Sequence, residues 1–450
     1  MHLLEPLSAS TPERPRRRGT AATAALAALA AAALSLSACG QDADSAQKSP
    51  SSTPPASPEE QVESDAGEVA APAPRLALTY DGGIQVLDAL TLELVADLPL
   101  DGFNRLNPAG DQRHVFVSTA GGFKLLDTGV YAVAHGDHAH YYAAAPVLED
   151  GIVVAAETPG HVVAHDDLTS LFDDATGHVT ILEADDLDVV TREYDSPAAH
   201  HGVAVALPDG QLVVTQGTSE ERTGIVVLDA SGAQVAESAD CPNVHGEAVA
   251  AEEAVAFGCQ GGALIYAEGA VAFASAPAPE GRISTIAANE SSPVALANYS
   301  LTGSEAPATS VALIDTAAKA VRTLDLGTPY TNFTVTDEGV GLVLGADGKL
   351  HVIDLAAAAE TASYQVIDPF EVPAEWQQPR PRVLMVAGMA YVTDTAGQAI
   401  HIVDPATGEI WKSGAVSVVP NEVVGVSGEG AGEHDHAEGE DHEDEDHEDE

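Results

Sequence analysis

Short apolar runs separated by turn residues dominate the chain from position 75 to about position 428. The runs are about five residues long and rich in Val, Ile and Leu, and turn signals such as Asp81-Gly82-Gly83 and Pro208-Asp209-Gly210 stand between them. Apolar runs bounded in this way are typical of β-strands. Apolar positions at helical spacing are almost absent. The pattern therefore predicts an all-β protein.

One strand motif, an apolar run that mostly ends in Asp, repeats along this region. Its copies are Ile84–Asp88, Lys124–Asp127, His178–Leu182, Gly224–Asp229, Val311–Asp315, Leu350–Asp354 and Ile400–Asp404. Successive copies are mostly about forty to fifty residues apart, which is the period of a four-stranded propeller blade. We therefore expect residues 75–428 to form a β-propeller of about eight four-stranded blades, with seven as the alternative. A pair of β-sandwiches is the second possibility, which the regular repeat disfavours.

The innermost strand of each blade is expected just before this motif. The segments in this position are HYYAAAPV, HGVAVALP, HGEAVAAE, RISTIAAN, TNFTVTDE and RVLMVAG, together with a strand near Phe103. The last apolar segment, NEVVGVSG at 421–428, comes after the final motif. We expect it to complete the first blade and so to close the ring.

The amino terminus has the pattern of a lipoprotein signal peptide. A basic segment at 14–18 precedes an alanine-rich apolar stretch that ends at Leu36-Ser37-Ala38-Cys39. Residues 1–39 are therefore expected to direct export, with lipidation at Cys39; an uncleaved anchor is the alternative. Residues 40–74 are rich in Pro, Ser and acid, which predicts a disordered tether. The protein is thus expected outside the cytoplasm, anchored by lipid to the outer face of the cell membrane.

The carboxyl terminus, 429–450, is predicted to be a disordered metal-binding tail. Positions 433–450 hold twelve carboxylates and four histidines, and these histidines are His434, His436, His442 and His447. Imidazole and carboxylate groups are ligands that Zn²⁺ accepts. The alternative is an acidic tail that only improves solubility.

The net charge of −52 excludes nucleic acid as a natural partner, because phosphate would be repelled. It favours cations. We expect a monomer that contacts the membrane only through its lipid.

The two cysteines that remain after lipidation, Cys241 and Cys259, are expected to form a disulfide. A pair of thiols outside the cytoplasm tends to oxidise. The alternative is zinc ligation, because Cys241 and His245 have a Cys-x3-His spacing.

Histidines recur where three successive inner strands are expected to begin. His201-Gly202 and His245-Gly246 occupy equivalent positions, and the segment HGDHAH at 135–140 precedes them. We therefore predict that His138, His140, His201 and His245 face one mouth of the channel and bind a metal, with Glu247 as a ligand or as the acceptor that orients an imidazole. For any single histidine, a hydrogen bond to a backbone carbonyl is the alternative.

Four further histidines are secondary candidates: His135, His161, His165 and His200. His161 and His165 are expected in an outer insertion of the blade that carries HGDHAH. Alternation along a strand lets only one of two adjacent side chains point inward, and we choose His201 over His200.

These motifs together resemble the AztD-type zinc metallochaperones. The resemblance rests on HGDHAH, the ETPGHVVAHDD segment, His200-His201-Gly202, the block Cys241-Pro-x-x-His245-Gly246-Glu247 and the acidic, His-rich segment. It implies a β-propeller that binds Zn²⁺ and passes it to the solute-binding protein of a zinc ABC importer. Here, however, the metal-rich segment is C-terminal and the chain has a lipoprotein signal.

Two other functional classes remain open from the residues alone. Three histidines around zinc can also serve a metal-dependent lyase or hydrolase, but a general base and a substrate pocket would be needed. The sequence has no Gly-x-Ser-x-Gly elbow, Gly-rich phosphate loop or paired-carboxylate signature. A surface-anchored interaction scaffold is the third class. We expect a metallochaperone and not an enzyme.

Overall fold

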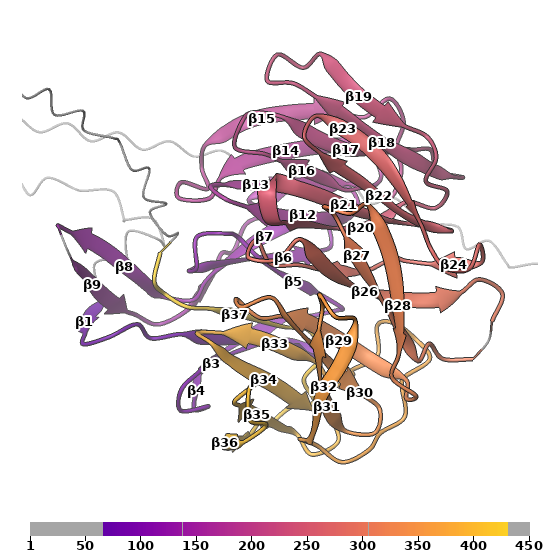
Figure 1. The fold of residues 1–450 in the computed structure, drawn as a ribbon. Coiled ribbons are helices and arrows are strands. Elements are labelled where there is room, and N and C mark those ends of the chain that lie inside the picture. The colour runs from indigo at the N-terminus through magenta and orange to yellow at the C-terminus, as the bar shows by residue number, and fades with distance from the viewer. Residues whose placement is uncertain (1–65, 137, 305, 431–450) are drawn as a thin grey trace, which may run out of the picture. The chain divides into compact units, whose positions relative to one another are not determined.

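The computed structural model describes residues 66–136, 138–304 and 306–430, all of which belong to one unit of the chain, residues 55–450. Apolar strands pair with their neighbours along the chain into eight successive antiparallel sheets (Figure 1). The described residues contain one 3₁₀ helix, η1 (Ala251–Glu253), and no helix long and apolar enough to cross a membrane. The predicted signal peptide with Cys39, and residues 431–450 of the predicted tail, lie outside the described residues.

The strands of each sheet, given from the innermost outward, define the blades. The first four blades are β37 (Val423–Val426), β2 (Arg75–Tyr80), β3 (Gly82–Asp88) and β4 (Leu94–Leu100); β5 (Arg105–Pro108), β6 (His114–Thr119), β7 (Gly122–Asp127) and β10 (Val147–Leu148), with β11 (Val154–Ala155) also on β7; β12 (Pro159–His165), β13 (Leu168–Asp173), β14 (His178–Glu183) and β15 (Val190–Asp195); and β16 (Ala204–Ala206), β17 (Leu212–Gly217), β18 (Arg222–Leu228) and β19 (Gln234–Ser238).

The remaining four blades follow the same plan. They are β20 (His245–Ala250), β21 (Ala254–Cys259), β22 (Gly262–Ala267) and β23 (Ala270–Ser275); β24 (Gly281–Arg282) and β25 (Ile286–Ala287), both paired with β26 (Val294–Leu301), then β27 (Ser310–Asp315) and β28 (Ala320–Asp325); β29 (Tyr330–Val335), β30 (Val340–Gly345), β31 (Lys349–Asp354) and β32 (Ala359–Gln365); and β33 (Val383–Val386), β34 (Met389–Asp394), β35 (Ala399–Val403) and β36 (Ile410–Ala415). The predicted propeller of eight four-stranded blades is confirmed.

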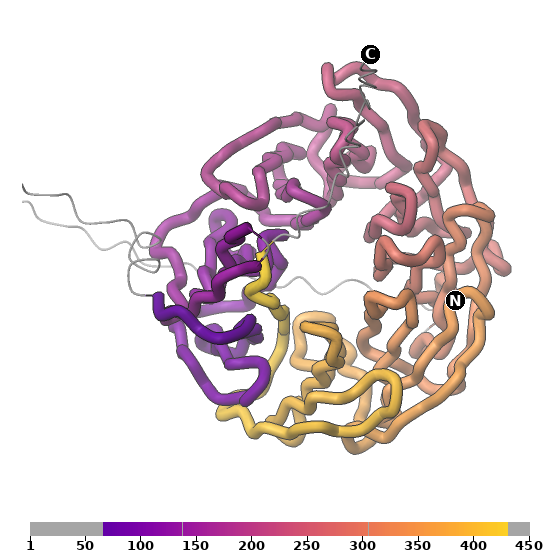
Figure 2. Tube along the Cα trace, turned by 60° about the vertical axis from the view of Figure 1, so that its left-hand side comes forward, coloured from indigo at the N-terminus to yellow at the C-terminus, as the bar shows by residue number. Residues whose placement is uncertain are grey.

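The last strand closes the ring. β37 pairs antiparallel with β2, with Arg75 opposite Val426 and Leu78 opposite Val423. The two ends of the propeller therefore share one blade, and Figure 2 shows the yellow segment beside the indigo one. The predicted closure by residues 421–428 is confirmed.

The core lies between neighbouring blades. Val205 and Val227 of the fourth blade pack with Phe257 and Leu264 of the fifth, and all four side chains are fully buried. The middle strands supply most of this apolar surface, whereas the outermost strands alternate between exposed and partly covered residues. The same cluster holds a disulfide between Cys241 and Cys259, whose Cα atoms are 5.0 Å apart.

A hairpin inserted in the second blade corrects one predicted inner strand. The segment HYYAAAPV does not line the channel; its first part belongs to β9 (His138–Ala143), which pairs with β8 (Val130–His135) and β1 (Gly67–Val69) in a separate three-stranded sheet. The second blade instead begins with β5, near Phe103 as expected. β1 also shows that part of the predicted tether, 40–74, is a strand.

The third blade corrects the placement of His161 and His165. The segment that we expected to be an outer insertion forms β12, the innermost strand of its own blade. Its register on β13 shifts between Pro159 and Val162. Similar shifts occur at the starts of the inner strands β20 and β29.

Candidate metal centre

Three imidazoles from three successive blades meet at one end of their inner strands. His161 is near the start of β12, His201 precedes β16 and His245 begins β20. The ring centroids are 5.1 Å apart for His161 and His201, 5.2 Å for His161 and His245, and 4.9 Å for His201 and His245. Each imidazole offers one nitrogen as a ligand atom, and these three nitrogens lie within 4.8 Å of one another. We call His161, His201 and His245 the trihistidine cluster.

Short inner strands and glycines allow this convergence. β16 has three residues, and Val163 of the third blade packs in one cluster with Val249 of the fifth. Gly246 directly follows His245 and has a φ of +73°, which a residue with a Cβ atom adopts at a cost. A Cβ at Gly246 would also press against the carbonyl oxygen of Ser284. The glycine after His245 therefore lets the backbone beside this imidazole approach Ser284 of the sixth blade.

The Nδ1 atom of each imidazole faces an oxygen. His201 Nδ1 lies 2.5 Å from Oδ2 of Asp174, His245 Nδ1 lies 2.6 Å from the carbonyl oxygen of Ser284, and His161 Nδ1 lies 3.3 Å from Oε2 of Glu247. The Nε2 atoms of His201 and His245 are 3.0 Å apart. Oxygens on Nδ1 fix a ring's orientation and leave Nε2 for a metal, which is the usual environment of a zinc-bound histidine.

His245 is held in the neutral form, the form that binds metals. Burial, together with the nearby His161 and His201, lowers the pKa of His245 to about 3. The site is still reachable, because the side chain of His201 keeps 39% of its exposure. Oε2 of Glu247 is buried beside His161 without a hydrogen-bond partner. A buried carboxylate oxygen without a partner is costly unless a cation is near, so the residues present fit a divalent metal.

The other predicted ligands form a second group. His135, His138 and His140 lie at the β8–β9 hairpin, with ligand atoms within 4.8 Å of one another. His140 Nδ1 lies 2.7 Å from Oε1 of Glu68, which precedes Val69 at the end of β1. The predicted single set is therefore divided in two: His138 and His140 do not meet His201 and His245 among the described residues. The cause is the hairpin, which removes HGDHAH from the inner-strand position.

The remaining predicted residues take other positions. His200 is buried and its ring nitrogens lie near the carbonyl oxygens of Ala198 and Thr215, so it does not join the trihistidine cluster. Glu247 faces His161. His165 lies at the other end of β12, among carboxylates. Cys241 is bonded to Cys259 and is not a metal ligand here.

Sequence reasoning missed Asp174 and Ser284 and gave His161 only a secondary place. Asp174 is 27 residues from His201 in the chain, and its other oxygen accepts a hydrogen bond from the amide of Gly202 at 3.2 Å. The Asp-Asp pair at the end of β13 was the available signal, but acidic pairs are common in this chain. Gly160 precedes His161, and a Cβ atom at this position would clash with the carboxylate of Asp174. A glycine here therefore leaves room for Asp174.

Comparison with known proteins gives a consistent result. No protein-family model matches the chain. The zinc chaperone AztD of Citrobacter koseri is 26% identical over 376 residues, which cover 80% of this chain and 87% of that protein. The crystal structure of Citrobacter koseri AztD has a TM-score of 0.67 at 25% identity and covers 79% of this chain and 98% of its own. The apo structure of the same protein has a TM-score of 0.67 at 24% identity, covering 81% and 100%. In sequence and in fold, the chain therefore resembles the zinc chaperone AztD, as its histidine motifs indicated.

Proposed function

We propose that this protein is a zinc metallochaperone that captures Zn²⁺ outside the cytoplasm and passes it to the solute-binding protein of a zinc ABC importer. The observation that carries the proposal is the trihistidine cluster, in which each Nδ1 faces an oxygen and each Nε2 is left for a metal. The resemblance to a zinc chaperone over four fifths of the chain supports zinc as the metal.

The arrangement suits a carrier. Three imidazoles on a rigid ring bind Zn²⁺ tightly, because little has to be reordered on binding. The partly exposed side chain of His201 leaves one side of the site accessible to an incoming ligand. Zn²⁺ has no redox chemistry and tolerates a fifth ligand, so it can pass to a partner by ligand exchange.

The other predicted metal sites are assigned to capture. His135, His138 and His140 form an accessible group at the hairpin, and the side chain of His140 is 37% exposed. The tail histidines, at 434–447, would bind loosely and raise the local concentration of cations. We propose that the chain is exported, that Cys39 carries the lipid anchor and that the mature protein is a monomer. In this proposal the tether, 40–74, holds the domain off the membrane.

An enzyme is the second candidate, which the described residues favour less. A zinc lyase or hydrolase needs a general base near the metal and a pocket for the substrate. Glu247 lies against His161 and is the nearest carboxylate on that ring's Nδ1 side. We assign Glu247 a place beside a metal ligand and propose no catalytic role for the protein.

The test is a chelator-competition titration of Zn²⁺ on the full chain. We expect one site of nanomolar affinity or tighter, and His245→Ala to weaken it at least tenfold because a metal ligand is lost. His401→Ala is the matched control, since His401 lies on β35 with its Nδ1 atom 2.8 Å from the hydroxyl of Ser413. If His245→Ala binds as tightly as the control, the trihistidine cluster is not the site.

A second experiment addresses delivery. Deletion of residues 431–450 is expected to slow zinc uptake in stopped-flow competition while leaving the tightest site unchanged. The zinc-loaded protein should then give up its metal to the importer's binding protein faster than free dissociation allows. Transfer no faster than dissociation into a chelator would contradict direct hand-over.

A further inference from the structure

A second cluster of ligand-type residues lies at the opposite ends of the same inner strands. His161 is near the start of β12 and His165 is its last residue; four residues span about 13 Å of strand at 3.3 Å each. β20 likewise starts with His245 and leads into η1, which ends at Glu253. The third and fifth blades therefore carry paired ligand groups at both ends of the channel wall.

His165 is surrounded by carboxylates from three blades. Its Nε2 atom lies 2.7 Å from Oε2 of Glu253 and 3.8 Å from Oδ2 of Asp166, and its Nδ1 atom lies 3.1 Å from Oε1 of Glu290. His165, Asp166 and Glu253 offer ligand atoms within 4.8 Å of one another. The His165 side chain is only 4% exposed, whereas those of Glu253 and Glu290 are 48% and 51% exposed.

The two contacts of His165 cannot both be hydrogen bonds from a neutral imidazole. A neutral imidazole has one N–H group, so it can donate to Glu253 or to Glu290 but not to both. The other contact then places a ring lone pair against a carboxylate oxygen in a buried position, which is unfavourable. A metal ion between the ring and Glu253, or a second ring proton, removes this conflict. The buried histidine, and not the acidic residues alone, is therefore the observation on which a cation site is argued.

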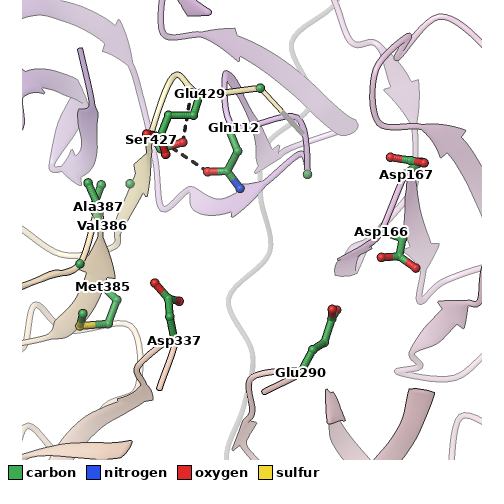
Figure 3. Close-up of a pocket in the computed structure, with 14 residues that line it drawn as sticks. Gln112, Asp166, Asp167, Glu290, Asp337, Met385, Val386, Ala387, Ser427 and Glu429 are labelled. Carbon is green, nitrogen blue, oxygen red and sulfur yellow. Dashed lines mark hydrogen bonds between the residues drawn. The ribbon is translucent and has the colours of Figure 1, made fainter. Parts of the chain in front are cut away.

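The surroundings are strongly acidic. His165, Asp166, Glu247 and Glu290 line one cavity of about 660 Å³. An adjoining cavity of about 770 Å³ shares Asp166 and Glu290 with it and adds Asp167, Asp337 and Glu429. Figure 3 shows Asp166, Asp167, Glu290 and Asp337 around this space. No lysine or arginine lines either cavity among the described residues. Such a field concentrates cations.

We propose that His165, Asp166 and Glu253 form a second divalent-cation site on the Nε2 side of the imidazole, separate from the trihistidine cluster, with Glu290 accepting a hydrogen bond from Nδ1 and orienting the ring. One imidazole with two carboxylates suits first-row divalent ions such as Zn²⁺ and Mn²⁺. The site is weaker than the trihistidine cluster, because Glu253 and Glu290 are half-exposed and must be ordered on binding. Gly430 and Glu429, the last described residues, line the adjoining cavity.

Buried Glu247 links the two groups. It lines the cavity of His165, and its Oε2 atom lies 3.3 Å from Nδ1 of His161. The cavity beside His165 therefore shares one lining residue, Glu247, with the surroundings of the trihistidine cluster. The proposal stands without the chaperone function, since it rests on the contacts of His165.

The experiment is crystallography of the full chain grown with Zn²⁺, with anomalous diffraction recorded on both sides of the zinc absorption edge. We expect a peak among His165, Asp166 and Glu253, and its loss in the double variant Glu253→Gln, Glu290→Gln, which removes a ligand charge and the acceptor that orients the ring. These half-exposed positions were chosen because replacement of buried His165 can unfold the protein. Glu237→Gln, an exposed change on β19, is the matched control and should keep the peak.

Two outcomes overturn the proposal. One is a peak at the trihistidine cluster with none at His165, in which case a proton bridges the carboxylates. The other is a peak at His165 that survives the double variant, which places the ion on other ligands. A peak at His165 with none at the trihistidine cluster would support this site and contradict the proposed function instead, so the two failures are distinguishable.

Discussion

Asp174→Asn tests whether the orientation of an imidazole, and not only its presence, sets the metal affinity. Asp174 accepts from Nδ1 of His201 through Oδ2 and from the amide of Gly202 through Oδ1. Asparagine keeps the shape but has one acceptor, so one of the two donors would face an NH₂ group. His201 would then lose its fixed tautomer or its fixed position.

The expected loss follows from this geometry. Replacing the group that orients a metal-binding histidine costs about 10- to 100-fold in affinity, or about 1.4–2.7 kcal/mol. The upper half of this range is expected, because the Asp174 side chain is only 15% exposed and water does not easily take its place. The assay is chelator competition for Zn²⁺, with circular dichroism to confirm the fold.

The control is a pair of the same kind outside the site. Asp195 on β15 faces Nδ1 of His178 at 2.8 Å and is 85% exposed. Asp195→Asn should leave zinc affinity unchanged. Equal affinities for the wild type and a folded Asp174→Asn variant would refute the claim that Asp174 positions His201.

Three predictions concern stability. In urea unfolding, Gly246→Ala should destabilise the fold by more than Gly269→Ala does. Both positions have a positive φ, of +73° and +76°, which costs a residue with a Cβ atom about 1–2 kcal/mol. Only the Cβ at position 246 would also meet a carbonyl oxygen. Cys241→Ser with Cys259→Ser should lower the free energy of unfolding by about 3 kcal/mol, because the bond closes a loop with a sequence separation of 18. Burial lowers the pKa of His114, but its hydrogen bond to Asp111 outweighs burial, so the pKa is raised. The contribution of protonated His114 to the stability of the fold is therefore complete below the unfolded pKa of about 6.5 and disappears as the pH rises through the folded pKa. Urea unfolding of the wild type and His114→Gln should therefore converge as the pH rises above 6.5.

Each of these has a clear contrary result. Equal losses for the two glycine variants would show that the contact at Ser284 adds nothing. If the free energy of unfolding is unchanged without the disulfide, the bond does not restrict the unfolded chain. A stability difference between the wild type and His114→Gln that grows above pH 6.5 would reverse the sign of the histidine's contribution.

The repeat in the sequence was enough to predict the propeller and its closure. Period-two runs with regular turns identify strands locally, because strand formation here depends on alternate burial and on Gly and Asp in the turns. NEVVGVSG had no partner nearby in the chain, so pairing with the first blade was the way to satisfy its backbone. The confirmed pairing of Leu78 with Val423 reflects that requirement.

The ligand set was only partly predictable. His201 and His245 share the His-Gly position in consecutive blades. Because the blades repeat around the ring, equivalent sequence positions take equivalent places in the fold. The HGDHAH motif had the same local appearance but belongs to an inserted hairpin, and nothing in its residues states that β9 pairs with β1. His161 received only a secondary place because its segment was expected to be an outer insertion, whereas it forms β12, the innermost strand of the third blade.

The sequence by itself therefore determined the strands, the blade period, the closing segment and the concentration of acid and histidine. The tertiary structure alone decided which histidines meet and which oxygens orient them. The alternation of buried and exposed residues along a strand depends on neighbours in the chain, so it can be recognised in a single sequence. A metal centre depends on atoms that converge across three blades, such as Asp174 on His201 and Ser284 on His245, and only the closed ring fixes those distances.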